Sequence, residues 1–537
     1  MLKLRNHFLL ALSFFALTLL QQYLFYLIKD RTIIWLPLPQ YLGYFVFFFI
    51  TTFCKGPRTR FVLLSLMMIL NLFQMGHLSY FGTQILPSGI YLFFTQFSEA
   101  QGTLKEELYH VMIPFFMTII PLALAFQIQK KIKTHFEWLV IPVLIFSYLS
   151  YNPLRTYLTG NTWGRQPSTN QLDGMNVYLS LSYFLGKILP NKFKTEHRFI
   201  SNRSMELKLT PLKKDPEWDK IIVVLGESLN PNHMSLLGYH KPTTPFLSSL
   251  KNDQNFHATI GLSSGVSTDI SVSFFLNMGY GHAGALKASK GKHCLFKLAK
   301  AQKFSTYFFS NQSKQQLRYI IPYLCLNSLD QLKFLEGIAP HVVDENAASD
   351  LNLLKPLTKI LADNDKQFII LNQRGSHSPW NLRYSPNSKK FLNVKEPRVT
   401  DYDNSVVEFD HFWKEFHEVL KIQKKKILVV YLSDHGEALG EDGRWGHGFL
   451  SPHTFEIPMM FKTYNKDLPE NVKKMPRFFP QYNLGILLTQ EMGYHSNQDA
   501  IRPASDFVVF GNDIDGFAGR ATIHFDTQGQ YQFKIGY

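Results

Sequence analysis

The stretch over residues 431–448, YLSDHGEALGEDGRWGHG, places an adjacent aspartate and histidine directly after an apolar run. That run, ILVV at residues 427–430, is typical of a buried parallel strand. Asp434 and His435 should therefore emerge at the carboxyl end of a strand, where open α/β sheets place their chemistry. A carboxylate oxygen and an imidazole nitrogen suit zinc, which makes a metal site one hypothesis. The alternative is a solvated turn, because Asp, Gly and Glu are ordinary turn residues.

A run of small hydroxyl residues offers a nucleophile. It lies in LSSGVSTDISVSFFLN, residues 262–277, just before an apolar stretch. A hydroxyl at a helix amino terminus faces unpaired N–H groups and a positive dipole, which favour an alkoxide and an attached phosphate. Thr268 is the candidate, and Ser263, Ser264 and Ser267 offer the same chemistry. Spacing alone does not choose among them, and the stretch by itself also fits a simple helix cap.

The elements that would position these residues begin near Asp219, where short apolar runs alternate with helical periods. This alternation predicts an α/β domain. Four runs end in polar residues: IIVVLG before Glu227, TYFFS before Asn311, FIIL before Asn372 and ILVVYLS before Asp434. Between the last two, apolar residues recur at steps of three and four and predict an amphipathic helix that covers the sheet. These residues are Val406, Phe409, Trp413, Phe416 and Leu420.

The first 155 residues have a different character, because long runs lack Asp, Glu, Lys and Arg. The runs cover residues 6–28, 32–54, 61 to about 80, 108–129 and the shorter 138–154. Each is long enough to cross a bilayer, the last at the low end of the range. We therefore predict a transmembrane domain of five helices over residues 1–155. A cleavable signal peptide would explain only the first run.

Loop charges predict the orientation of this domain. Basic residues gather in the amino end and in alternate connections: Lys3, Arg5, Lys55, Arg58, Arg60, Lys130, Lys131 and Lys133. By the positive-inside rule the amino terminus is cytoplasmic and the chain beyond the fifth span lies outside. A linker with one amphipathic helix around residues 177–189 is expected over residues 156–218, and the catalytic domain over 219–537. The formal net charge of +15 suits an anionic membrane surface, and no nucleic-acid partner is expected.

Six motifs occur in a characteristic order. They are GES at residues 226–228 with MSLLGYHKPTTPFL at 234–247, SSGVSTDISVS at 263–273, GSHSP at 375–379, YDNS at 402–405 and SDHGEALGEDGRWGHG at 433–448. The set resembles the alkaline phosphatase and sulfatase superfamily, and more closely the bacterial phosphoethanolamine transferases that modify lipopolysaccharide. The resemblance implies a multi-pass protein of the bacterial inner membrane with a periplasmic catalytic domain. Its fold would be an α-helical membrane domain of about five helices plus an α/β sulfatase-like domain, with a largely parallel central sheet flanked by helices.

The resemblance also implies the site residues, carried over motif by motif. They are the zinc ligands Glu227, Thr268, Asp434 and His435, the catalytic residues Thr268, His377 and His447, and the substrate-binding residues Asn311, Gln312, His377 and His447. Three protein donors of oxygen and nitrogen type, with a nucleophile in the fourth position, are also what zinc chemistry requires. One tightly bound zinc is expected, and a second ion is left open.

The implied activity is zinc-dependent transfer of phosphoethanolamine from phosphatidylethanolamine to a lipopolysaccharide acceptor through a phosphothreonine intermediate. The acceptor, a core sugar or lipid A, stays open, and we expect a membrane-bound monomer. One alternative is a phosphoglycerol transferase or phosphodiesterase of the same superfamily, and another is a membrane sensor with a degenerate ectodomain. Sulfatase activity is disfavoured, because residues 267–271 do not fit the Cys/Ser-x-Pro-x-Arg segment that sulfatases modify.

Cysteine usage departs from these relatives. The lipid A-modifying members usually carry several disulfides in the exported domain, including a pair that flanks the nucleophile, and Ser264 and Phe274 stand at the corresponding positions here. Only Cys294 and Cys325 lie outside the predicted membrane domain. In an oxidising compartment they would form one disulfide, and two free thiols are the alternative.

Overall fold

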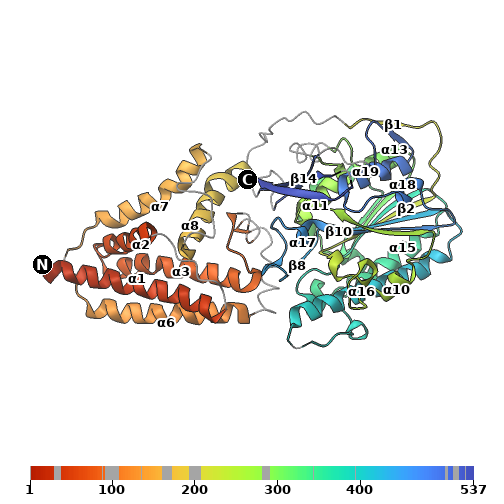
Figure 1. Cartoon of the computed structure of the whole chain (residues 1–537). Coiled ribbons are helices and arrows are strands. Elements are labelled where there is room, and N and C mark those ends of the chain that lie inside the picture. The colour runs from red at the N-terminus through yellow and green to blue at the C-terminus, as the bar shows by residue number, and fades with distance from the viewer. Residues whose placement is uncertain are drawn as a thin grey trace. The chain divides into compact units, whose positions relative to one another are not determined.

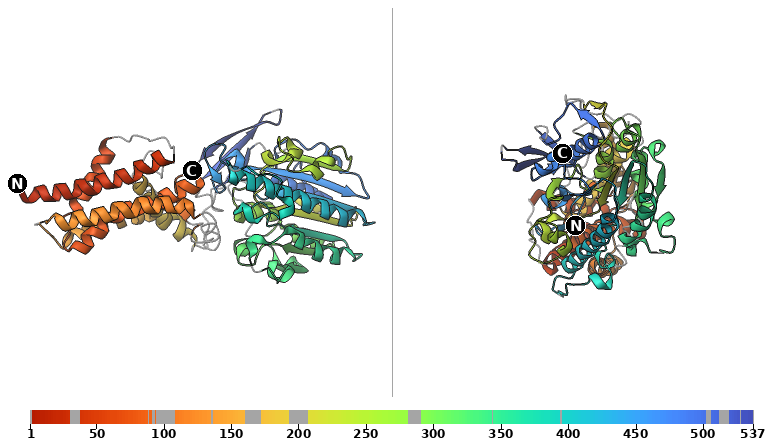
Figure 2. Two further views of the ribbon diagram at one scale, coloured as in Figure 1. Left: turned by 90° about the horizontal axis from the view of Figure 1, so that it is seen from below. Right: turned by 90° about the vertical axis from the view of Figure 1, so that its right-hand side faces the viewer.

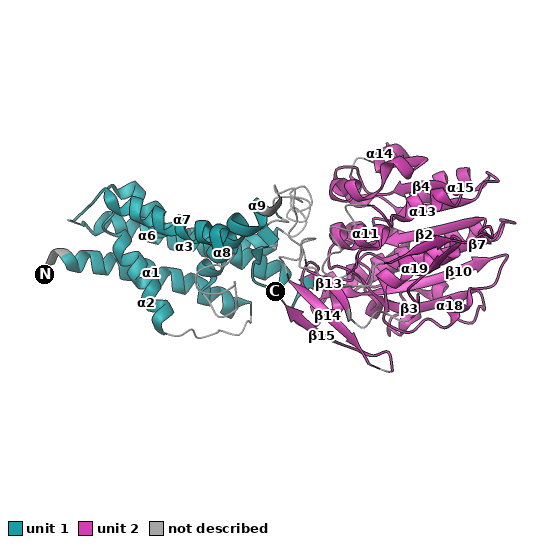
Figure 3. Ribbon diagram, turned by 90° about the horizontal axis from the view of Figure 1, so that it is seen from above, with its two compact units in different colours: residues 1–196, 442–445 teal, residues 197–441, 446–537 magenta. Residues whose placement is uncertain are grey.

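The structure is a computed structural model of the 537-residue chain, in which the chain divides into two compact units. One contains residues 1–196 and 442–445, and the other contains residues 197–441 and 446–537 (Figure 3). The residues described are 2–29, 38–87, 89–90, 93, 108–134, 136–159, 172–192, 207–280, 291–342, 344–393, 395–501, 506–511, 519–526 and 528–536.

The first unit is helical. Its helices are α1 (Leu2–Ile28), α2 (Leu38–Thr51), α3 (Pro57–Phe81), α6 (Tyr109–Lys131), α7 (Val140–Thr159), α8 (Asp173–Tyr183) and α9 (Leu189–Lys192). Helices α1, α3 and α6 run side by side (Figures 1 and 2). Three spans, Leu4–Ile28, Pro57–Phe81 and His110–Lys131, are long and apolar enough to cross a membrane, and α2 is a shorter apolar helix. The count of five membrane spans remains a prediction.

Helix α8 and the π-helical turn Phe184–Ile188 lie where we predicted the amphipathic helix of the linker. Most of their residues are buried, and α8 packs against α3. Gly174 allows this close crossing, because a Cβ atom there would lie 3.1 Å from Oδ1 of Asn71 and 3.2 Å from the Tyr44 hydroxyl. The helix therefore packs as part of the helical unit, which extends to residue 196. The boundaries at residues 156 and 219 remain predictions.

The second unit is built on an eight-stranded sheet. Its order is β11 (Phe479–Pro480), β3 (Phe256–Leu262), β10 (Glu456–Tyr464), β7 (Ile427–Ser433), β2 (Lys220–Gly226), β6 (Gln367–Asn372), β4 (Ser305–Ser310) and β5 (Gln331–Lys333). All neighbours pair in parallel except β10, which is antiparallel to both β3 and β7. The four strands predicted from apolar runs are β2, β4, β6 and β7, and the predicted largely parallel sheet is confirmed.

Helices cover both faces of this sheet (Figure 1). One face carries α11 (Thr268–Asn277), α13 (Leu295–Ala301) and α19 (Gln481–Glu491), which share a core with alternate strand residues such as Val223 and Val430. The other face carries the predicted amphipathic helix, α16 (Pro397–Lys421). Its Phe409 and Trp413 rings pack on Tyr431 of β7, with ring centroids 5.0 and 5.9 Å apart.

The remaining elements are short. They are α10 (Pro245–Ser249), α14 (Leu335–Ile338), α15 (Leu354–Leu361), α17 (Pro452–Phe455), α18 (Glu470–Lys473), the strand pair β1 (Leu209–Pro211) with β12 (Tyr494–Ser496), the strands β8 (Ala438–Leu439) and β9 (Trp445–Gly446), and the antiparallel sheet β13 (Asp506–Phe510), β14 (Arg520–Phe525) and β15 (Tyr531–Gly536).

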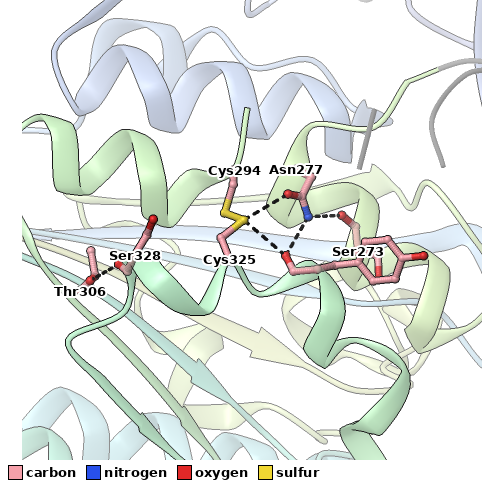
Figure 4. The surroundings of a disulfide bond; sticks show 7 residues. Ser273, Asn277, Cys294, Thr306, Cys325 and Ser328 are labelled. Atoms are coloured by element: carbon pink, nitrogen blue, oxygen red, sulfur yellow. Dashed lines mark hydrogen bonds between the residues drawn. A yellow bond between two sulfur atoms is a disulfide. The ribbon is translucent and has the colours of Figure 1, made fainter. Parts of the chain in front are cut away.

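Cys294 and Cys325 form a disulfide (Figure 4). It joins the start of α13 to the loop before β5, and the Cys325 sulfur lies 3.6 Å from Oδ1 of Asn277 at the end of α11. Of the two alternatives that the sequence left open, the structure has the disulfide.

Candidate functional site

The site lies at the carboxyl edge of the sheet, where four predicted residues meet. Glu227 directly follows β2, and Asp434 and His435 follow the neighbouring strand β7. Nε2 of His435 lies 3.4 Å from Oε1 of Glu227 and 3.4 Å from Oδ2 of Asp434. All three side chains are buried. The three residues follow apolar strands, as predicted, and the structure adds that the two strands are neighbours in the sheet.

Thr268 completes the group. The loop after β3 ends at Ser267, and Thr268 is the first residue of α11. Its Oγ1 lies 3.3 Å from Oε2 of Glu227 and 3.4 Å from Nε2 of His435. The hydroxyl thus combines a helix amino terminus with direct access to the carboxylate and imidazole groups. The other candidate Ser267 turns to Asp269, to which its hydroxyl donates at 2.6 Å.

The two carboxylate oxygens of Asp434 differ in their hydrogen bonds. Its Oδ1 accepts hydrogen bonds from the backbone N–H groups of Ser228 at 3.1 Å and His435 at 2.7 Å. Its Oδ2 is buried and accepts no hydrogen bond from any residue that the structure describes. A buried carboxylate oxygen without a hydrogen bond costs free energy unless another ligand satisfies it.

The electrostatics of the site also favour a cation. Burial and the negative charge of Glu227 raise the pKa of Asp434 to about 7. Burial alone would lower the pKa of His435, but the carboxylates of Asp434 and Glu227 raise it to about 10. Burial would likewise raise the pKa of Glu227, but the hydrogen bond and charge of His435 outweigh it and hold this pKa below its ordinary value. Two buried carboxylates thus share one imidazole, and positive charge is in deficit.

A backbone contact fixes the orientation of the His435 ring, and an unusual turn follows Glu227. Nδ1 of His435 donates to the carbonyl oxygen of Gly436 at 2.9 Å, so Nε2 is the nitrogen that faces Glu227 and Thr268. Ser228, next to Glu227, has a φ of 56°, which non-glycine residues rarely adopt. The Tyr402 hydroxyl supports this turn by donating to the Ser228 carbonyl oxygen at 2.7 Å.

Two further predicted histidines lie beside this group. The rings of His447 and His435 have centroids 4.1 Å apart, and those of His447 and His377 are 5.8 Å apart. Nδ1 of His447 donates to Glu437 at 2.8 Å, and Nδ1 of His377 donates to the Ser378 carbonyl oxygen at 2.6 Å. In each ring Nδ1 makes this bond, so Nε2 is the second nitrogen through which the ring could act on a substrate. Burial and the nearby Arg374 hold the pKa of His377 well below its ordinary value.

The structure separates the two predicted substrate-binding residues that follow β4. Gln312 reaches the site, because its Nε2 donates to Oε2 of Glu227 at 3.2 Å. Asn311 turns away and donates to Oδ1 of Asp350 at 2.9 Å, and its Oδ1 accepts from Asn352 at 3.3 Å. A direct substrate contact by Asn311 therefore has no support in this geometry, whereas Gln312 touches a site residue.

Sequence reasoning gave no role to Glu437 and Tyr402, which hold site residues in place. Both lie in motifs that were recognised, SDHGE and YDNS, so their positions were visible although their contacts were not. Glu437 is buried and is separated from His447 by a surface loop. Tyr402 lies on α16, about 170 residues from the turn that it contacts.

The donor set fits a divalent metal. Glu227, Asp434 and His435 offer ligand atoms that all lie within 4.8 Å of one another, and so do His435, Glu437 and His447. The first group includes the unsatisfied Oδ2 of Asp434 and has two carboxylates, so it suits a 2+ charge. In the second group, Glu437 and His447 already bond to each other.

Comparison with known proteins agrees with the fold. Residues 219–477 match the family described as Sulfatase, so this part of the chain is a domain of the sulfatase class. The curated relatives are phosphoethanolamine transferases. Two of them are Kdo(2)-lipid A phosphoethanolamine 7''-transferase of Salmonella typhimurium, 27% identical over 265 residues, and phosphoethanolamine transferase EptA of Helicobacter pylori, 26% identical over 257 residues.

These alignments cover 46% and 45% of this chain, and 45% and 47% of the two relatives. The chain thus matches less than half of the length of each. A solved structure extends the likeness in fold to the helical unit. It is the integral membrane protein lipooligosaccharide phosphoethanolamine transferase A of Neisseria meningitidis. The structural alignment covers 92% of this chain and 96% of that protein, with 18% identity and a TM-score of 0.59. The predicted fold class, membrane helices followed by a sulfatase-like domain, is therefore confirmed.

Proposed function

We propose that this protein transfers phosphoethanolamine from phosphatidylethanolamine to a lipopolysaccharide acceptor, a core sugar or lipid A, through a phosphothreonine at Thr268. The observation that carries the proposal is the position of Thr268 Oγ1, within 3.4 Å of both Glu227 and His435. A hydroxyl nucleophile beside a cation-binding group is the arrangement that covalent phosphoryl transfer requires. The curated relatives, which are phosphoethanolamine transferases, supply the reaction class.

Zinc is the cofactor that we propose. The ligands would be Glu227, Asp434, His435 and Oγ1 of Thr268, and a bound zinc ion would favour the ionised form of the Thr268 hydroxyl. The unsatisfied Oδ2 of Asp434 supports this assignment. We propose a single tightly bound ion, because the carboxylate and imidazole of the second candidate group are already bonded to each other.

The reaction has two displacements. In the first, the ionised Oγ1 of Thr268, whose hydroxyl proton has already passed to solvent, forms a bond to the donor phosphorus and the bond from phosphorus to the glycerol oxygen breaks. The departing diacylglycerol oxygen takes a proton from Nε2 of His447 in its imidazolium form, because the lowered pKa of His377 keeps that ring neutral. In the second, the acceptor hydroxyl loses its proton to the same nitrogen and attacks phosphorus, which releases Thr268. Gln312 would act by orienting Glu227, because its Nε2 donates to Oε2 of Glu227 at 3.2 Å and to the Gln373 carbonyl oxygen at 2.8 Å.

We place this reaction on the outer side of the bacterial inner membrane. The support is the basic residues in alternate loops, together with three helices of membrane-spanning length. A reporter fused after Tyr537 should be active only outside the cytoplasm, and one fused after Lys133 only inside. The reverse pattern would contradict the topology and leave the chemistry untouched.

The decisive experiment incubates the purified, zinc-loaded full-length protein with phosphatidylethanolamine and maps adducts by mass spectrometry. Wild-type protein should carry a phosphoethanolamine ester on Thr268 and release diacylglycerol, and Thr268→Ala should lose both. The Ser267→Ala variant is the matched control and should keep both, because its hydroxyl bonds to Asp269. A glycerophosphate adduct formed from phosphatidylglycerol instead would favour the phosphoglycerol transferase. No turnover of either phospholipid with zinc bound would favour a sensor.

A further inference from the structure

Gln481, the first residue of α19, contacts the chain on both sides of the nucleophile. Its Oε1 accepts a hydrogen bond from the backbone N–H of Ser264 at 3.0 Å, four residues before Thr268. Its Nε2 donates to the hydroxyl of Ser271 at 3.1 Å, three residues after Thr268. The Gln481 side chain is fully buried. One amide thus joins the loop that leads into α11 to the first turn of that helix.

The contacts continue to a predicted metal ligand. The Ser271 hydroxyl donates to the backbone carbonyl oxygen of Asp434, and the Ser263 hydroxyl lies 2.5 Å from the same oxygen. The direction of these bonds is fixed. A backbone N–H can only donate, so Oε1 of Gln481 must face Ser264, and its Nε2 then faces Ser271. The single Ser271 hydroxyl proton is therefore available for Asp434.

This chain of bonds connects two elements that the sheet does not hold together directly. Asp434 follows β7, whereas Thr268 begins α11, and β10 lies between β7 and β3 in the sheet. A second set of contacts holds the other side of the loop. The N–H of Phe510 in β13 donates to the Ser264 carbonyl oxygen at 2.9 Å, and the N–H of Val266 donates to the Phe510 carbonyl oxygen at 3.2 Å. The loop is thus fixed from two directions.

We propose that Gln481 is a positioning residue that sets the location of the Thr268 hydroxyl relative to Asp434. The proposal rests on the proposed role of Thr268 as nucleophile. A displacement of about 1 Å can cost on the order of 100-fold in rate, so a buried amide that fixes this separation affects catalysis without touching the substrate. A glutamine that only filled space in the core would be replaceable by an apolar side chain of similar size.

The test replaces Gln481 by methionine, which keeps the length of the side chain and removes both polar contacts. The rate at which the Thr268 adduct forms should fall by roughly 10- to 100-fold, with zinc content and the KM for phosphatidylethanolamine within about twofold of wild type. Gln490→Met is the matched control on the same helix. Gln490 bonds to Asn471 near the surface, so this variant should react like the wild type.

A second variant tests whether the rate effect of Gln481→Met depends on the bond to Ser271. Ser271→Ala should slow adduct formation to a similar extent, and adding it to Gln481→Met should cause little further loss, because both substitutions break one path. Losses that multiply in the double variant would overturn the proposal. So would a Gln481→Met protein that forms the adduct at the wild-type rate.

Hydrogen–deuterium exchange of the full-length protein gives a readout that needs no substrate. In Gln481→Met and Ser271→Ala, the backbone amides of residues 264–272 should exchange faster than in the wild type and in Gln490→Met, with or without zinc. If the amides of residues 264–272 exchange at the wild-type rate in both variants, the inference is overturned, whatever the rate of adduct formation. If the wild type forms no adduct but the exchange difference is present, the proposed reaction fails and the positioning by Gln481 stands.

Discussion

Each unit contains a buried polar cluster, and the two clusters are built differently. In the helical unit the side chains are neutral and bond to one another. Nε2 of Gln21 donates to the Thr118 hydroxyl at 2.6 Å, and Nδ2 of Asn71 donates to Oε1 of Gln21 at 3.3 Å. In the second unit, Glu227 and His435 approach only to 3.4 Å and leave Oδ2 of Asp434 without a hydrogen bond from the described residues.

The difference separates a structural cluster from a binding site. Burying a charge without full compensation costs far more than burying a neutral amide. Oδ1 of Asn71 and Oδ2 of Asp434 both lack a hydrogen bond from the described residues, but only the second belongs to a charged group, so the unmet cost is larger in the charged cluster and a bound cation would offset it.

The strongest test of this comparison is Asp434→Asn, which keeps the shape and removes the charge. Zinc affinity should fall by at least about 100-fold, because one of only two carboxylate ligands loses its charge. In zinc-free protein the same variant should melt no lower than the wild type, since the repulsion between Asp434 and Glu227 is gone. Titration calorimetry and melting curves measure both. Asp410→Asn is the control, because this buried aspartate bonds to backbone N–H groups of α10 and should leave zinc affinity unchanged.

His447→Ala sharpens the comparison by separating the ligands from their neighbours. His447 bonds to Glu437 and stacks on His435, so we expect it to move protons and not to hold the metal. Zinc content should stay at the wild-type level, and turnover should fall by roughly 10²- to 10⁴-fold. The half-exposed His411 on α16 provides the control, and His411→Ala should be fully active. Loss of zinc from His447→Ala would instead identify the second group as a metal site.

Much of this site could be predicted because its residues follow apolar strands. Glu227, Asp434 and His435 end β2 and β7, and parallel strands bring their carboxyl ends to one edge. Thr268 could be named only through resemblance, since four neighbouring hydroxyls had the same local signal. The structure shows how Ser263 and Ser267 differ from it: the first bonds to the backbone of Asp434 and the second to the Asp269 carboxylate.

Contacts between segments that are far apart in the chain could not be predicted from the sequence. Gln481 begins α19, more than 200 residues after Ser264, and an isolated Gln-Tyr-Asn gives no local signal for a contact with the nucleophile loop. For Asn311 the sequence pattern predicted a substrate contact that the structure does not support. It follows a strand just as Glu227 does, but its amide turns to Asp350, and side-chain direction after a strand end depends on neighbours that the pattern does not contain. The disulfide was left open for the same reason.

The disulfide provides a test of stability that involves neither polar cluster. Replacing Cys294 and Cys325 by serine should lower the free energy of unfolding by about 2–4 kcal/mol, as loss of a native disulfide typically does. Zinc affinity should not change, because the bond lies at the far end of α11 from Thr268. Thiol titration of the unreduced, unfolded wild type should find one free thiol, Cys54. Three thiols would show that the disulfide does not form.

The smallest expected effect is in the neutral cluster. Asn71→Leu removes the bonds from Asn71 to Oε1 of Gln21 and to the Thr18 carbonyl oxygen, which are 3.3 and 3.5 Å long. Hydrogen bonds between membrane helices contribute about 0.6 kcal/mol on average and at most about 1.7 kcal/mol, and these two are long. The unfolding free energy of the helical unit in detergent should therefore fall by less than about 1 kcal/mol.

Turnover and zinc content of Asn71→Leu should match those of Ile69→Leu, a control at a partly exposed position of the same helix. A neutral network has no metal ion to lose, so its disruption should change only how firmly α3 is held against α1. An Asn71→Leu protein that keeps its melting temperature but loses phospholipid turnover would break the comparison, because the neutral cluster would then take part in the reaction.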